Sequence, residues 1–187
     1  RDGEVLYNVW PKNPEEYVTF TEGQMATIIL PTTPDTSMGK YYRLDRYEDG
    51  KIIFEEEPTP KARTPYIIIP NKDFYIDPNS LNLKGLDEDV VSKDGISFIG
   101  TYSKAEYSYN EEVFISIIDK TPDCRKEDIP ISKFTIGSLR AFVKVHWQDP
   151  YNPGGTRGVK KIEIIVLLAK QLLVGHLMVL VLFSGAG

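Results

Sequence analysis

Side chains that could act as nucleophiles or transfer protons are few in this sequence. Cys124 is the only cysteine, and Arg125 and Lys126 follow it, which would favour a thiolate. A catalytic cysteine also needs a positioned base, and the only imidazoles are His146 and His176. There is no G-x-S-x-G turn either. We therefore interpret Cys124 as a thiol on a polar loop and assign no catalytic residue.

Two acidic groups could supply oxygen ligands for calcium. They are Asp87, Glu88, Asp89 and Asp94 in the first, and Asp119, Asp123 and Asp128 in the second. Neither group has the spacing of a calcium-binding loop, so we interpret both as solvated turn residues. Two histidines with no spaced partner exclude a zinc site, and residues 154–158 lack the phosphate-loop spacing. We expect no metal and no cofactor.

Glycoside hydrolysis would need two carboxylates held about 5 to 10 Å apart across a cleft. Glu106, Glu111 and Glu112 are candidates by type, but sequence spacing does not establish that geometry. A carbohydrate-active enzyme fragment therefore remains the alternative to a protein without catalysis.

Aromatic side chains are the better candidates for ligand contact. β-Sandwiches often present tyrosine and tryptophan faces to sugars, and such residues recur here: Tyr41, Tyr42, Tyr107, Tyr109 and Trp147. The alternative is that tyrosine is simply a good strand residue with a hydrated hydroxyl.

The charge balance argues against nucleic acid as a partner. The chain of 187 residues carries 22 basic and 27 acidic side chains, a formal net charge of -5, with no basic cluster. Affinity for phosphates depends largely on clustered lysine and arginine. We therefore expect a protein or a glycan as the partner, if there is one.

The elements that must position these residues are predicted to be strands. Isoleucine and valine far outnumber alanine, and 13 Pro and 14 Gly separate short apolar runs. The predicted strands are Tyr17–Phe20, Met25–Leu30, Tyr41–Tyr47, Lys51–Glu55, Tyr66–Ile69, Ser80–Leu83, Ile96–Ser103, Glu112–Ile118, Leu139–Trp147 and Lys161–Leu167.

Turn residues and alternation add detail to this prediction. The pair Asp49-Gly50 predicts an antiparallel hairpin, and Asn110 is expected in a turn between two further runs. Ile67 and Ile68 lie in a run that is apolar on both faces, which indicates a central strand. In Leu139–Trp147 one face is predicted to be core and the other, with Arg140 and Phe142, to be wet. The predicted fold class is all-β, an antiparallel β-sandwich of about 8 to 10 short strands.

The expected organisation is an N-terminal extension (1–16), a β-sandwich module (17–148), a loop or linker (149–160), and a final strand with an atypical apolar tail (161–187). The stretch Ile162–Phe183 is long enough to span a bilayer, but Glu163 and Lys170 oppose that reading. Three interpretations stay open: a membrane-associated segment, a strand followed by a buried or partner-dependent segment, and a non-native tail. Membrane association is expected only through residues 162–183.

Four segments carry a family resemblance over about 120 residues. They are Ala26–Pro31, Thr64–Pro70, Phe98–Tyr102 and Leu139–Val145. In order and spacing they resemble the W-x-T-I-x-L-P, G-x-P-Y-L-I-K-P, F-x-G-x-Y and R-A-Y/F pattern of a β-sandwich module found in surface and secreted proteins of Bacteroidota, often beside leucine-rich repeats. Ala26, Thr64 and Ile69 depart from that pattern.

The resemblance implies a non-catalytic accessory or adhesion-type module of an extracellular or cell-surface bacterial protein. It carries over no catalytic residues, and it leaves the ligand open between protein and glycan. The alternatives are the enzyme fragment and a structural spacer or anchored stalk.

Overall fold

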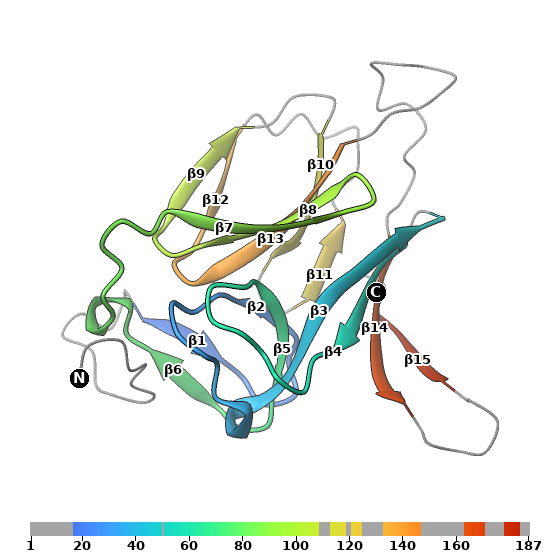
Figure 1. The fold of residues 1–187 in the computed structure, drawn as a ribbon, viewed down its shortest axis with the longest axis horizontal. Helices are drawn as coiled ribbons and strands as arrows, with labels where there is room; N and C mark the ends of the chain where they lie inside the picture. The colour runs from blue at the N-terminus through green and yellow to red at the C-terminus, as the bar shows by residue number, and fades with distance from the viewer. Residues whose placement is uncertain are drawn as a thin grey trace.

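The computed structural model describes residues 17–49, 51–108, 113–118, 121–124, 133–146, 163–170 and 178–183. Within these ranges the regular elements are strands, apart from two short 3₁₀ turns, η2 (Thr36–Met38) and η3 (Pro78–Ser80) (Figure 1). The predicted all-β class is confirmed. Residues 1–16 and 149–160, predicted as extension and linker, lie outside the described residues.

The first large sheet has six strands. Its order is β15 (Met178–Phe183), β14 (Glu163–Lys170), β4 (Lys51–Glu56), β3 (Gly39–Glu48), β5 (Tyr66–Pro70) and β2 (Ala26–Ile28). The predicted hairpin is confirmed, because β3 and β4 pair antiparallel and Asp49 has a φ of 51°. β5 lies between β3 and β2, so the prediction of a central strand is also confirmed. β14 joins β4 in parallel.

The second large sheet has five strands, and two short ribbons accompany the large sheets. The five-stranded order is β11 (Thr121–Cys124), β10 (Val113–Ile118), β13 (Arg140–His146), β8 (Ile96–Thr101) and β7 (Glu88–Lys93). One ribbon pairs β1 (Val18–Phe20) with β6 (Phe74–Ile76), and the other pairs β9 (Ala105–Ser108) with β12 (Lys133–Ile136). β9 and β10 are in different sheets, and Asn110 between them lies outside the described residues.

Side chains from both large sheets meet in one core cluster. Phe54 of the six-stranded sheet contacts Phe98 of the five-stranded sheet edge to face, with ring centroids 5.3 Å apart. Ala141 and Val143 of β13 join them, as predicted for the inner face of that strand. The finer expectation, one two-layer sandwich of 8 to 10 strands, stays a prediction, because the described strands divide among four sheets.

The two ribbons bury parts of the faces that the large sheets turn away from this cluster. Phe20 and Phe74 of the β1–β6 ribbon stack with centroids 4.5 Å apart, in a second core with Tyr66 and Ile68 of β5. The β9–β12 ribbon places Tyr107 and Ile136 on Phe142 of β13.

The prediction of a wet outer face for β13 is therefore wrong. Phe142 is 1% exposed and Arg140 is 8% exposed. Arg140 donates to the backbone carbonyls of Thr27 (3.2 Å) and Thr19 (2.7 Å), and its guanidinium lies over the Phe20 ring. Strand alternation alone does not reveal this burial, because the covering segments are distant in sequence.

The predicted strand Ser80–Leu83 is also wrong. The Asp77 side chain accepts a hydrogen bond from the backbone N–H of Asn79, and Pro78 begins the 3₁₀ turn η3 at this point. Leu81 and Leu83 follow without regular strand pairing and pack partly against the second core.

The apolar C-terminal stretch forms strands in its described parts. β14 and β15 pair antiparallel, and Val166 of β14 is fully buried in the cluster between the large sheets. Among the described residues, no helix has the length and apolar character needed to cross a membrane.

Gly100 generates the first testable prediction. A Cβ at this position would lie 2.9 Å from Ile29 Cβ and would also meet Ile29 Cδ1. We expect Gly100→Ala to lower the free energy of unfolding by about 1–3 kcal/mol, measured by denaturant titration, because close-packed cores tolerate added volume poorly.

The matched control is Gly137→Ala, whose added Cβ would meet only Arg140 Cγ at 3.7 Å. In an Ile29→Ala background the same Gly100 substitution should cost less, because Cδ1 and Cγ1 of Ile29 are gone and only its Cβ still crowds the new methyl group. Equal costs in both backgrounds would contradict the contact.

Candidate functional site

Two of the predicted ligand-contact tyrosines lie in the core. Tyr41 and Tyr42 are each 1% exposed. Burial, together with the charge of Glu56, raises the pKa of Tyr42 to about 12. The hydroxyl of Tyr41 donates to the Asp35 carbonyl at 2.9 Å. Neither side chain presents a ring face to solvent, because both faces of β3 are covered at this point.

Of the remaining three ligand-contact candidates, the structure describes only Tyr107. Tyr107 is half-buried, with its ring 4.7 Å from that of Phe142 and its hydroxyl donating to Glu88 at 3.1 Å. Burial and the negative charge of Glu88 raise the pKa of Tyr107. Tyr109 and Trp147 lie outside the described residues.

Strand β7 is the open edge of the five-stranded sheet. It pairs with β8 on one side, in an uninterrupted antiparallel register from Glu88 opposite Thr101 to Lys93 opposite Ile96. The N–H of Tyr102 donates to the carbonyl of Asp87, one residue before this register begins. Because backbone direction alternates along an antiparallel pair, the backbone groups of Glu88, Val90 and Ser92 are directed away from β8, toward the edge.

Val90 is the exposed apolar residue of this edge. Its exposed fraction is 47%, and within the described residues it is the one large hydrophobic side chain classed as exposed. It lies opposite Ile99 of β8, which lies opposite Phe142 of β13. An apolar row thus crosses the sheet from a ribbon-covered centre to an uncovered end at Val90.

A polar cluster fixes the start of β7. Arg63 donates two hydrogen bonds to the Asp89 carboxylate, at 3.0 and 3.2 Å, and the hydroxyl of Tyr102 donates to the same carboxylate. Burial alone would raise the pKa of Asp89, but the hydrogen bonds from Arg63 and Tyr102 outweigh it and lower that pKa. Burial and the Asp89 carboxylate together raise the pKa of Tyr102.

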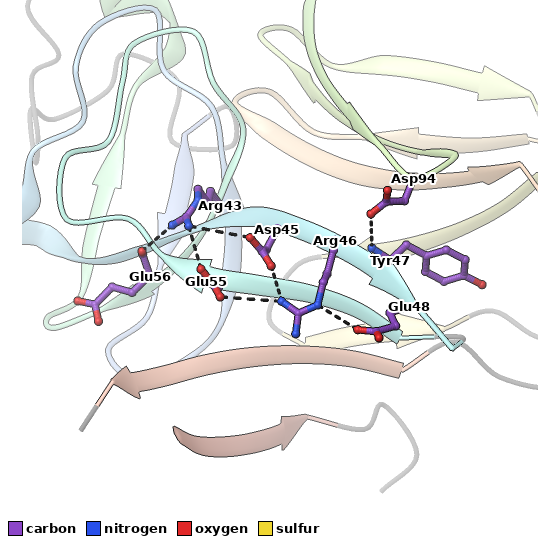
Figure 2. A network of polar contacts seen from close by, with 8 residues as sticks. All are labelled: Arg43, Asp45, Arg46, Tyr47, Glu48, Glu55, Glu56 and Asp94. Carbon is purple, nitrogen blue, oxygen red and sulfur yellow. Dashed lines mark hydrogen bonds and ion pairs between the residues drawn. The ribbon is translucent and has the colours of Figure 1, made fainter. Parts of the chain in front are cut away.

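The other end of β7 is tied to the six-stranded sheet. Asp94 and Gly95, with φ of 52° and 80°, form the two-residue turn between β7 and β8. The Asp94 carboxylate accepts a hydrogen bond of 3.3 Å from the backbone N–H of Tyr47 in β3 (Figure 2). β7 is therefore held at both ends while its middle faces outward.

A second polar network covers the hairpin of β3 and β4 (Figure 2). Arg43 binds Glu55 at 2.9 Å and the carbonyl of Glu56 at 2.9 Å, and Arg46 bonds Asp45 and Glu48. These side chains are partly exposed, so each ion pair contributes about 1 kcal/mol or less. We interpret the network as part of a solvated surface that stabilises the hairpin, in which each arginine is paired with a carboxylate.

Three of the candidate acidic residues have structural partners. Glu88 accepts a hydrogen bond from the hydroxyl of Tyr107. Asp89 accepts from Arg63 and from the hydroxyl of Tyr102, and Asp94 accepts from the backbone N–H of Tyr47. No cluster of three or more potential metal ligands occurs in the described ranges. Asp119, Asp128, Glu111, Glu112 and His176 lie outside those ranges.

Sequence reasoning missed strand β7, although a signal for it was present. The segment from Glu88 to Lys93 is polar, so it resembles a loop, but Asp94-Gly95 follows it immediately. The same residue pair at Asp49-Gly50 identified the β3–β4 hairpin. Each face of β7 carries both apolar and polar side chains, since Val91 shares its face with Asp89 and Val90 shares its face with Glu88. The alternation that identifies a strand is therefore weak.

Removing the Asp89 charge should weaken the fold in a pH-dependent way. The folded pKa of Asp89 is lowered, so its contribution is complete above its ordinary pKa near 4 and is lost as pH falls through the folded pKa. We expect Asp89→Asn to lower the free energy of unfolding by about 1–2 kcal/mol at pH 7. The difference from wild type should shrink as pH falls below the ordinary pKa of an aspartate.

Chemical denaturation at a series of pH values measures this effect. Asp94→Asn is the control, because the amide oxygen can still accept from the Tyr47 N–H, and its effect should stay within about 0.5 kcal/mol. A loss at Asp89→Asn that is the same at pH 2 and pH 7 would rule out the charged contact as its cause.

Comparison with known proteins identifies no relative. No protein-family model matches the chain, and no curated protein or solved structure shows a significant match.

Proposed function

We propose that this chain is a non-catalytic accessory or adhesion-type module of a bacterial cell-surface or secreted protein, and that it binds protein along strand β7. The location and the accessory role rest on the resemblance of the four sequence segments. The choice of protein over glycan rests on the geometry of the edge strand.

The single observation that carries the proposal is an open, regular edge strand with an exposed valine at its middle. Proteins usually blunt such edges with charged side chains, proline, bulges or covering loops, because unpaired backbone groups attract other strands. In β7 the charged Glu88 and Lys93 are at the two ends, and Asp89 is bound by Arg63. The register of β7 against β8 has no bulge, and Val90 is 47% exposed. An extended peptide can add to such an edge through main-chain hydrogen bonds, with side-chain contacts supplying selectivity.

Glycan binding has less support from the described residues. Two of the five aromatic candidates, Tyr41 and Tyr42, are core residues, and Tyr107 packs on Phe142. Stacking against a sugar requires an accessible ring face.

Peptide binding to the full chain tests the proposal. We expect extended peptides with alternating apolar residues to bind, detected by fluorescence anisotropy at low protein concentration. Val90→Pro should weaken binding at least tenfold, because it removes an edge-directed N–H while leaving the ladder to β8 intact.

The matched control is Val90→Thr, which keeps the backbone donor and the branched side chain. It should bind within a few fold of wild type. Unchanged binding by a folded Val90→Pro variant, or no binding to any of the peptides, would contradict the proposed role of β7.

A further inference from the structure

We infer that the strand which β7 accepts is β7 of a second copy of this chain, added antiparallel. This inference rests on the proposed function, because it names the partner for the same edge. Three features favour this partner: the direction of the backbone, the position of Val90 and the distribution of charge along the strand.

The backbone fixes which residues can face each other. A two-fold axis perpendicular to the sheet makes two strands antiparallel and keeps the same faces on the same side. Glu88, Val90 and Ser92 direct their backbone groups to the edge. In one register the edge-directed backbone groups of all three residues can form hydrogen bonds. This register places Val90 opposite Val90 of the second copy, and Glu88 opposite Ser92 of the second copy.

This register also buries the exposed apolar residue. Val90 ends the row that continues through Ile99 to Phe142. With Val90 of each copy opposite the other, the two rows become one apolar strip across the joined sheets. A directly opposed pair of β-branched side chains is a favourable cross-strand contact.

Strand β7 has acidic residues at one end and a basic residue at the other. When two copies pair antiparallel, the acidic end of each copy therefore meets the basic end of the other. Asp87 and Glu88 are at its start, Lys93 is at its end, and all three are exposed. In the inferred register Asp87 lies opposite Lys93 of the second copy, and this pairing occurs twice. A parallel arrangement in register would instead place acid beside acid.

The mass of the full chain in solution is the first test. Analytical ultracentrifugation over about 1 to 200 µM should show a reversible monomer–dimer equilibrium, between 21.2 kDa and twice that mass. We expect a dissociation constant in the micromolar range, because a single strand-to-strand contact is a small interface.

Two charge reversals provide the decisive test. Lys93→Glu and Asp87→Lys should each weaken dimerisation at least tenfold, because each places like charges opposite one another at both ends. An equimolar mixture of the two variants should recover the dimer, since every facing pair then has opposite charges. Lys72→Glu, at an exposed lysine away from β7, should leave dimerisation unchanged.

The outcomes separate this inference from the proposed function. A chain that stays monomeric at every concentration but binds peptides at β7 overturns self-pairing and leaves the proposed function standing. A dimer that is indifferent to both reversals, or that mixing does not restore, overturns the inferred register. A chain that neither dimerises nor binds peptides overturns both.

Discussion

Arg140 joins three of the four sheets through one buried side chain. It extends from β13 of the five-stranded sheet, and its guanidinium donates to carbonyls in β2 of the six-stranded sheet and at Thr19 of the β1–β6 ribbon. The same group lies 4.5 Å from the centroid of the Phe20 ring. A buried cation is costly unless its donors are satisfied. The relative placement of these sheets is therefore constrained by the need to bring both carbonyls to Arg140.

The neighbourhood of Arg140 is also where the four resembling segments meet. Ile29 of the first segment donates its N–H to the carbonyl of Leu139 and packs against Gly100, while Tyr66 and Tyr102 belong to the same core. Segments separated by up to about 120 residues thus share one set of contacts. Their motifs therefore have a packing explanation.

Strand β7 differs from the strands around Arg140, because it is fixed at its ends and exposed in its middle. Its ends are tied by Asp89 to Arg63 and Tyr102, and by Asp94 to β3, while Val90 between them is exposed. A strand fixed at both ends loses little conformational entropy when another strand pairs with it. The open edge is consequently preorganised for the strand addition that we propose, in contrast to the charge-matched surface of Arg43 and Arg46 on the other sheet.

The sequence by itself determined the all-β class, the Asp49-Gly50 hairpin and the central position of Ile67 and Ile68, because turn chemistry and alternation are local properties. It did not determine that Tyr41, Tyr42, Phe142 and Arg140 are buried, since the ribbons and the facing sheet that cover them come from distant parts of the chain. Nor did it locate the candidate edge, because the polar segment before Asp94-Gly95 becomes a strand only when β8 satisfies its backbone groups. Long-range packing decides which sheet face is exposed to solvent and which sheet edge is unpaired. Only the tertiary structure contains that information.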